Sequence, residues 1–316
     1  MEKEILIAGG SGLIGANLMF KLKEHGLPFV ASRNKKSTEI FQEHCVRYDF
    51  LDFDQCLQAT KNKSAVILCA AVSYGAKGNK ENPTGSILPN LQIAAGLLEA
   101  SARNNVGSVL VISSTTVYQA AFFPIREDLL DLNVPPFDAY FGVGWYNRYL
   151  EQLASLYHKI YGMQVIIFRP TNIYGPYDKF DVEHSHVVPA LIKRALDRED
   201  PFEVWGSPQV VRDFLYVEDF VDDIFYSLIH DDIPSNTPIN VCSGSPQFIE
   251  YTVEVILKVC NHDPRVSFNL DKPSTIPYRA VDDAFYRSLF KKRNRTPFEI
   301  GVRKTVNWYQ RQAAKV

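Results

Sequence analysis

Three glycines spaced three residues apart are the residues of this sequence that most directly suggest a chemistry. They follow the apolar run Ile5-Leu6-Ile7-Ala8 and precede a helical pattern. In a strand–turn–helix unit, the first glycine permits the tight turn and the second lets the backbone approach a diphosphate. The third lets the helix pack on the strand, and the start of the helix offers free N–H groups and a partial positive charge. The turn is therefore predicted to bind a dinucleotide through Gly9, Gly12, Leu13, Ile14 and Gly15.

The end of the second predicted strand bears on which dinucleotide is bound. An acidic residue there would accept a hydrogen bond from the adenosine ribose 2′-hydroxyl and repel a 2′-phosphate. This chain instead has Ser32-Arg33-Asn34-Lys35-Lys36, whose hydroxyl, guanidinium and ammonium groups suit a phosphate. Ser32 and Arg33 therefore favour NADP, with NAD as the alternative. A solvated basic loop would show the same residues without binding either.

These residues must be positioned by alternating strands and helices. Apolar strands are expected at 29–31, 46–49, 65–71, 109–112 and 165–168, and helices at 13–25, 37–44, 53–60, 88–100 and 145–161. Such alternation with short connections is typical of a parallel sheet covered on both faces. We therefore expect an α/β fold: a Rossmann-type doubly wound parallel sheet with a smaller C-terminal α/β substrate domain. After Arg169-Pro170, residues 171–188 read as a long irregular loop.

Composition restricts the partners. The formal net charge is −2 over 316 residues, so no basic field favours nucleic acid or an anionic membrane. No apolar run approaches the length of a bilayer span, and a strand starting at residue 5 leaves no room for a signal peptide. The five cysteines form no close pairs and are expected to be reduced core residues. We expect a cytoplasmic protein with a small-molecule ligand.

Several longer motifs resemble the extended short-chain dehydrogenase/reductases, the NAD-dependent epimerase/dehydratase family. The motifs are Asn90 within its helix, the run Ser114-Thr115-Thr116-Val117-Tyr118, and Arg169-Pro170-Thr171-Asn172-Ile173-Tyr174-Gly175-Pro176. The segments 177–180 and 185–192 look most like the branch that contains the GDP-L-fucose synthases. The resemblance covers nearly the whole chain. It implies an NAD(P)-dependent epimerase, dehydratase or reductase that acts at C4 of a GDP- or other nucleotide-linked hexose.

The change in sequence character after Arg169-Pro170 predicts two domains. Residues 1–171 would form the dinucleotide-binding domain, with 214–242 returning to it, and 172–316 would mainly bind the sugar nucleotide. The helices at 88–101 and 147–161 match those that form a homodimer interface in the family. In this chain they could also simply pack against the sheet.

Family chemistry uses a tyrosine and a lysine four residues later, which handle the proton that accompanies hydride transfer. With the spacing of the family kept without gaps, these positions hold Val143 and Asn147. Sliding the register to use Tyr140 places Gly144 at the lysine position and requires an insertion later. Valine has no transferable proton, and asparagine has no charge to stabilise a neighbouring phenolate. Both registers therefore lose the lysine.

Two explanations of this loss remain open. In the first, another group supplies the proton, and Tyr140 and Tyr146 lie close enough in the sequence to do so. In the second, the chain binds cofactor and sugar nucleotide without redox turnover, as a binding or partner subunit.

Epimerisation at C3 and C5 depends, in the family, on a histidine and a cysteine. His186 matches the histidine, but the cysteine position holds Thr116, whose hydroxyl is a poor base, so double epimerisation is not expected. His186 could equally be a loop histidine that makes a hydrogen bond. His184 and His186 lack an evident third ligand, so no metal site is expected.

The remaining site residues are expected by resemblance alone. The catalytic set is Ser114, Thr116, Tyr140 and His186. Further cofactor contacts would be Asp49, Phe50, Ala70, Ala71, Asn90, Asn147, Pro170 and Asn172. Substrate contacts would be Asn172, His186, Val187, Arg194, Trp205, Arg212, Lys272 and Arg279. Asp49 could instead cap a helix, and Lys193 next to this set is as well explained as a solvated surface charge.

Overall fold

A seven-stranded parallel sheet forms the centre of the molecule. The computed structural model describes residues 4–33, 40–72, 82, 84–181, 185–271, 276–290 and 294–314. Across the sheet the strands run in the order β3, β2, β1, β4, β5, β6, β11. Their bounds are β1 (Glu4–Ala8), β2 (Phe29–Arg33), β3 (Cys45–Arg47), β4 (Lys63–Leu68), β5 (Ser108–Ile112), β6 (Gln164–Pro170) and β11 (Pro238–Val241). This order is that of a Rossmann sheet extended by one strand, so the predicted fold class is confirmed.

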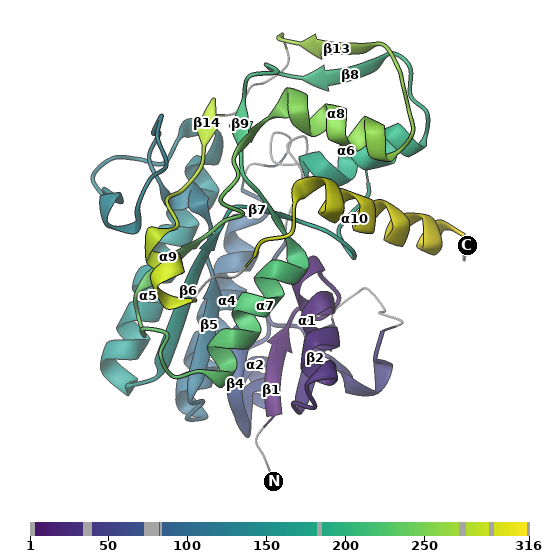
Figure 1. Ribbon diagram of the computed structural model, residues 1–316. Helices are drawn as coiled ribbons and strands as arrows, with labels where there is room; N and C mark the ends of the chain where they lie inside the picture. The colour runs from purple at the N-terminus through teal and green to yellow at the C-terminus, as the bar shows by residue number, and fades with distance from the viewer. Residues whose placement is uncertain are drawn as a thin grey trace.

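Helices cover both faces of this sheet (Figure 1). On one face lie α2 (Phe53–Thr60), α4 (Ile87–Arg103) and α5 (Phe141–Tyr161), and on the other α1 (Leu13–Glu24), α7 (Val217–Ile229) and α9 (Ala284–Leu289). The run Ala65–Leu68 of β4 is buried throughout, as expected for a parallel strand covered on both sides. The two hydrophobic cores therefore hold the carboxyl ends of the strands, where the site forms, in fixed positions.

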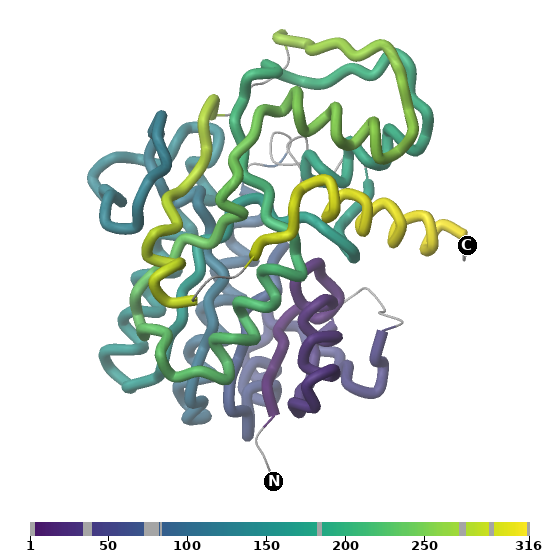
Figure 2. The backbone as a smooth tube through the Cα atoms, viewed as in Figure 1, coloured from purple at the N-terminus to yellow at the C-terminus, as the bar shows by residue number. Residues whose placement is uncertain are grey.

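The C-terminal part winds between the sheet and a second, smaller assembly. The helices α6, α8 and α10 lie together on the side of the sheet away from the N-terminus, whereas α7 and α9 pack on a face of the sheet (Figure 1, Figure 2). The helices are α6 (Val187–Leu196), α8 (Ile249–Val259) and α10 (Phe298–Ala313). The short strands are β7 (Asn172–Tyr174), β8 (Phe202–Trp205), β9 (Val211–Arg212), β10 (Phe214–Tyr216), β12 (Gln247–Phe248), β13 (Val266–Asn269) and β14 (Tyr278–Arg279). They pair as β7 with β10, β8 with β13, and β9 between β12 and β14.

Two expectations about local structure need correction. The helix expected at 37–44 is only a single 3₁₀ turn, Gln42–His44, in the described part of that range, because Phe41 has φ of 45° and interrupts a helical path. The loop expected at 171–188 contains β7, which pairs in parallel with β10. Pairing with so distant a partner leaves no signal within the loop itself.

Two further features predicted from the sequence are the state of the cysteines and the apolar character of the helices. All five cysteines are free thiols, and Cys56, Cys242 and Cys260 are buried. Among the described residues, no helix combines the length and the apolar character that a bilayer crossing requires.

Candidate functional site

The glycine turn between β1 and α1 forms a cradle with one open side. Gly9 has φ of +103°, and a Cβ on it would lie 2.7 Å from the Ala70 backbone nitrogen; a Cβ on Gly15 would lie 2.2 Å from the Gly9 carbonyl oxygen. On Gly12, by contrast, the nearest heavy atom would be the Gly9 oxygen at 3.5 Å. Gly12 precedes α1, and no side chain caps the helix there. The second glycine therefore faces open space at an uncapped helix start, which is the geometry that fits a diphosphate.

The end of β2 lies beside this turn. The Ser32 hydroxyl oxygen accepts a hydrogen bond from the Gly9 N–H at 2.7 Å and is buried, so it already holds the turn in place. The Arg33 Nε is buried and has no hydrogen-bond partner among the described residues. A buried guanidinium nitrogen without a partner carries a cost that an anion could remove. The residues here therefore fit a phosphate-bearing nucleotide, while Asn34, Lys35 and Lys36 lie outside the described residues.

The other cofactor candidates have structural partners. Asp49 accepts a hydrogen bond from the Leu51 N–H at 3.2 Å in the turn before α2. It does not cap that helix, because the N-cap residue is Asp52, whose side chain accepts from the Asp54 N–H at 2.9 Å. Phe50 is buried in the core under α2 and α4. Asn90 holds the backbone after β4, since its side chain bonds both the N–H and the carbonyl of Val72, at 2.7 and 2.9 Å. That backbone follows Ala70 and Ala71.

The start of α5 lies against the 3₁₀ turn at Thr115–Val117. A Cβ on Gly144 would lie 2.6 Å from the Thr116 carbonyl oxygen, so the helix approaches this turn closely. Ser114 caps the turn, because its hydroxyl oxygen accepts from the Thr116 N–H at 3.2 Å. The buried Asn147 side chain donates to the Val143 carbonyl at 2.9 Å and contacts the Thr116 hydroxyl at 3.4 Å. The Asn147 amide therefore has its hydrogen bonds within the protein.

A cluster of polar side chains lies beyond this helix start. The Arg279 guanidinium donates to the Asn172 side-chain oxygen and lies 4.8 Å from the centre of the Tyr140 ring. The Arg212 guanidinium makes a hydrogen bond to the Tyr140 hydroxyl and donates to the Val211 carbonyl at 2.6 Å. Burial lowers the pKa of Arg212 to about 10, with Arg279 adding repulsion, so Arg212 remains charged at neutral pH.

One small cavity joins this cluster to the turn after β5. It measures about 20 Å³, which is room for one water molecule, and Thr116, Phe137, Tyr140 and Arg279 are among its lining residues. The structure therefore brings Thr116, Tyr140, Asn172, Arg212 and Arg279 together, although they come from five separate stretches of the chain.

His186 lies at the start of α6. The residue is exposed as a whole, but its ring is desolvated by neighbouring atoms, and this lowers the pKa of the imidazole, with Lys179 and Arg279 contributing further. A lowered pKa keeps the ring neutral at neutral pH, since protonation needs a more acidic solution. The described residues contain no cluster of three or more histidine, cysteine or acidic side chains able to hold a metal ion.

The other substrate candidates lie apart from the cluster around Tyr140 or outside the described residues. Arg194 forms an ion pair with Glu199 and packs over Phe202. Trp205 is 55% exposed at the end of β8, and its ring nitrogen donates to Glu203 at 3.1 Å. Val187 is the exposed first residue of α6. Lys272 and His184 lie outside the described residues.

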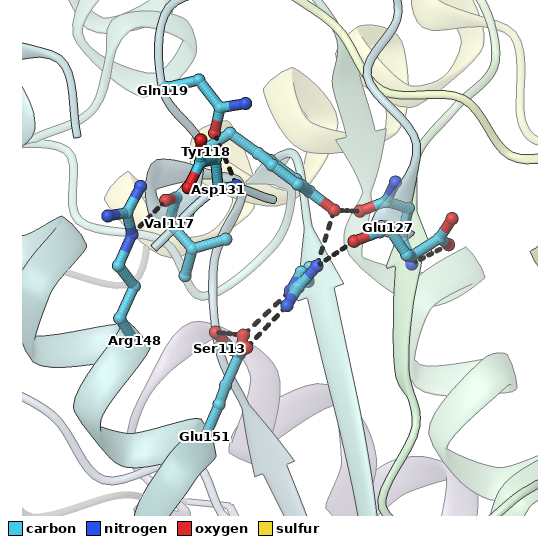
Figure 3. A network of polar contacts seen from close by, with 10 residues as sticks. Ser113, Val117, Tyr118, Gln119, Glu127, Asp131, Arg148 and Glu151 are labelled. Atoms are coloured by element: carbon cyan, nitrogen blue, oxygen red, sulfur yellow. Dashed lines mark hydrogen bonds and ion pairs between the residues drawn. The ribbon is translucent and has the colours of Figure 1, made fainter. Parts of the chain in front are cut away.

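Sequence reasoning missed a buried polar network under the site (Figure 3). Arg169 at the end of β6 forms an ion pair with Glu151 of α5 at 2.7 Å, and both side chains are 4% exposed. The Ser113 hydroxyl donates to Glu151 at 2.5 Å, and Arg169 donates to the Tyr118 hydroxyl at 2.8 Å. The Tyr118 hydroxyl in turn donates to Asn240 of β11. Arg169 stands in a quoted motif and Glu151 within the helix expected at 145–161, but nothing in the sequence indicated that they pair.

Comparison with known proteins finds one matching family model and relatives that extend over nearly the whole chain. The model of the NAD-dependent epimerase/dehydratase family matches residues 5–242. GDP-L-fucose synthase of Sinorhizobium fredii is 29% identical over 309 residues, covering 96% of this chain and 94% of the relative. GDP-L-colitose synthase of Yersinia pseudotuberculosis is 26% identical over 315 residues, covering 97% of each.

Among solved structures, UDP-glucose 4-epimerase of Thermotoga maritima superposes with a TM-score of 0.85 at 20% identity. The superposition covers 98% of this chain and 99% of the epimerase, and it shows a shared fold.

Proposed function

Because the chain belongs to the NAD-dependent epimerase/dehydratase family, we propose that it is an NADP-linked enzyme that acts at C4 of a nucleotide-linked hexose. The observation that carries this proposal is that two candidate sites lie beyond the carboxyl ends of the strands of the central sheet. The open Gly12 cradle and the Arg33 Nε, which has no hydrogen-bond partner in the described part of the chain, suit a dinucleotide. The cluster of Tyr140, Arg212 and Arg279 suits an anionic sugar nucleotide. The relatives that act on GDP-sugars favour a GDP-linked hexose.

Each end of the site has a defined task in this proposal. The N–H groups at the start of α1 would hold the cofactor diphosphate, and Arg33 would pair with the adenosine 2′-phosphate. A bound nicotinamide would supply or accept a hydride at the sugar carbon. Ser114 and Thr116 would orient the C4 oxygen of the sugar, and Arg212 and Arg279 would place positive charge beside it. Without a cysteine beside His186, we do not assign it double epimerisation.

A second function is favoured by one specific observation. The Asn147 NH2 group bonds the Val143 carbonyl and the Thr116 hydroxyl, and a neutral amide at the position of the family lysine offers no charge to a cofactor ribose or to a tyrosine. The alternative is a family member that binds cofactor and sugar nucleotide as a non-redox binding or partner subunit.

The experiment that tests the proposal combines binding and turnover. NADPH and NADH are titrated into the purified protein, and NADPH consumption is then followed with GDP-, UDP- and dTDP-linked 4-keto hexoses; NADP reduction is followed with the 4-hydroxy forms. We expect NADPH to bind at least about tenfold more tightly than NADH, a difference of about 1.4 kcal/mol. Turnover of a GDP-linked substrate supports the enzyme. Tight binding of both ligands with no turnover supports the binding subunit.

An Arg33→Ala variant isolates the cofactor preference. It should lose the preference for NADPH and keep its affinity for NADH, because the ion pair with the 2′-phosphate is removed and the diphosphate cradle is untouched. The exposed Arg103 at the end of α4 supplies the matched control as Arg103→Ala, which should leave both affinities unchanged. A wild-type protein that prefers NADH would refute the NADP assignment, and one that binds neither dinucleotide would refute the function.

We also propose that two copies of the chain pair through α5. The helix carries a row of exposed apolar side chains on one face, among them Phe141, Tyr149, Leu156 and Ile160, which is 63% exposed. Sedimentation equilibrium should give twice the chain mass of 35.9 kDa. Ile160→Glu should yield a folded monomer, whereas Leu270→Glu, at an equally exposed site after β13, should remain a dimer. A monomeric wild-type protein contradicts this assignment.

A further inference from the structure

The helix face that should carry the proton chemistry has no group able to transfer a proton. Val143 is aliphatic, and the Asn147 amide bonds the Val143 carbonyl and contacts the Thr116 hydroxyl. An amide of this kind neither gives up a proton nor stabilises a phenolate by charge. If the proposed function holds, the proton must come from another element that reaches the same space.

Tyr140 lies one turn before this face and continues it. It is the N-cap residue of α5, three positions before Val143 and seven before Asn147, a spacing that places all three along one side of a helix. Its side chain lines the same cavity as Thr116. Tyr140 therefore borders the space next to the Ser114–Thr116 turn, on the side where Arg212 and Arg279 lie.

Two guanidinium groups surround this tyrosine. Arg212 makes a hydrogen bond to the Tyr140 hydroxyl, and Arg279 stands 4.8 Å from the ring centre. A guanidinium is only a donor, so Arg212 donates to the phenolic oxygen and does not use the phenolic proton. The two arginines also repel each other across the site. A negative charge on the Tyr140 oxygen would relieve this repulsion.

We propose that Tyr140 and Arg212, supported by Arg279, form a tyrosine–arginine pair that replaces the missing tyrosine and lysine as the proton donor at the sugar C4 oxygen. The pair rests on the proposed function and specifies its catalytic group. An arginine suits this task because it stays charged through the neutral pH range and donates in a fixed geometry. The cation that a lysine would supply from α5 is here supplied from β9.

The proton balance of the step is complete. In the reduction, the carbonyl carbon of a 4-keto sugar would receive the hydride that NADPH gives up on becoming NADP⁺, and the π electrons of the C=O bond would move to the oxygen. That oxygen takes the proton from Tyr140, which becomes a phenolate held by Arg212 and Arg279. Water then reprotonates the phenolate, and the reverse direction follows the same path. Proton transfer of this kind typically contributes about 10²–10⁴-fold to the rate.

Tyr140→Phe tests the pair, because it keeps the ring over Arg279 and removes only the hydroxyl. We expect kcat to fall by about 10²–10⁴-fold, while affinities for NADPH and GDP stay within about threefold of wild type. Tyr251→Phe is the control, since Tyr251 is 50% exposed on α8, is not among the residues lining this cavity, and should keep full turnover. Arg212→Lys should retain part of kcat, and Arg212→Met should lose it, which separates the need for a charge from a purely structural role.

A second readout needs no turnover. Alkaline titration of the ligand-free protein, followed by phenolate absorbance, should show one tyrosine that ionises at lower pH than the others and that is missing in Tyr140→Phe. Full turnover in Tyr140→Phe, or an unchanged titration curve, overturns the pair and leaves the proposed function standing. A wild-type protein that binds both ligands without turnover overturns Tyr140 as a catalyst and supports the binding subunit. Failure to bind either ligand refutes the proposed function itself.

Discussion

Glu151→Gln should lower the free energy of unfolding by about 3–5 kcal/mol, the usual cost of removing one partner of a buried ion pair. Glu151 accepts from Arg169 and from the Ser113 hydroxyl at positions that are almost entirely buried. The neutral amide removes the charge and keeps the shape, so Arg169 is left charged without its counter-ion. Chemical unfolding followed by circular dichroism measures the loss.

Two variants check this explanation. Glu99→Gln, in the far more exposed pair between Glu99 and Arg103 of α4, should change stability by less than about 1 kcal/mol. The double variant Glu151→Leu with Arg169→Met should recover much of the loss, because replacing both charges leaves no uncompensated ion in the core. A Glu151→Gln protein as stable as wild type would mean that the network contributes little to stability.

The same network connects stability to the site. It joins α5, the end of β6 and the turn after β5, which are the elements that position Asn147, Asn172 and Thr116. Glu151→Gln should therefore weaken binding of the sugar nucleotide even at temperatures where the variant is still folded. The network is a positioning device, and none of its members is assigned to contact the substrate.

Gly15→Ala should strongly destabilise the fold and Gly12→Ala should not, although the two glycines are only three residues apart. A Cβ on Gly15 would lie 2.2 Å from the Gly9 carbonyl oxygen, so α1 must move away from the turn, and we expect a loss of about 3 kcal/mol or more in stability. A Cβ on Gly12 meets nothing closer than 3.5 Å, and its φ of −89° suits alanine. That variant should fold with stability within about 1 kcal/mol of wild type.

Cofactor binding distinguishes the two variants further. In Gly12→Ala the new methyl group projects into the space where the diphosphate would approach the backbone, so NADPH affinity should fall by about 100-fold or more, near 2.7 kcal/mol. Thermal unfolding and NADPH titration on the same samples measure both quantities. Unchanged affinity in a folded Gly12→Ala protein would move the dinucleotide away from this turn.

The sequence by itself determined the central sheet and the cofactor turn. Strand–helix alternation is a local pattern, and a strand segment buried on both faces, such as Ala65–Leu68 of β4, is apolar over consecutive positions. The glycine spacing is also local, because the turn, the close approach and the helix start all occur within seven residues, Gly9 to Gly15. These features could be predicted because the residues that cause them are neighbours in the chain.

Only the tertiary structure decided which distant side chains meet. Neither the ion pair of Arg169 with Glu151 nor the parallel pairing of β7 with β10 leaves a pattern in one segment. Sequence reasoning found Val143 and Asn147 where a tyrosine and a lysine were expected. It named Tyr140 and Tyr146 as groups that could supply the proton and placed Tyr140 in the catalytic set. The fold separates the two: the Tyr146 hydroxyl lies 3.5 Å from the Asn90 carbonyl, towards α4, whereas Tyr140 meets Arg212 and Arg279. Contacts of this kind depend on where packing over the whole molecule places β9 and β14, which carry Arg212 and Arg279, relative to Tyr140 at the start of α5.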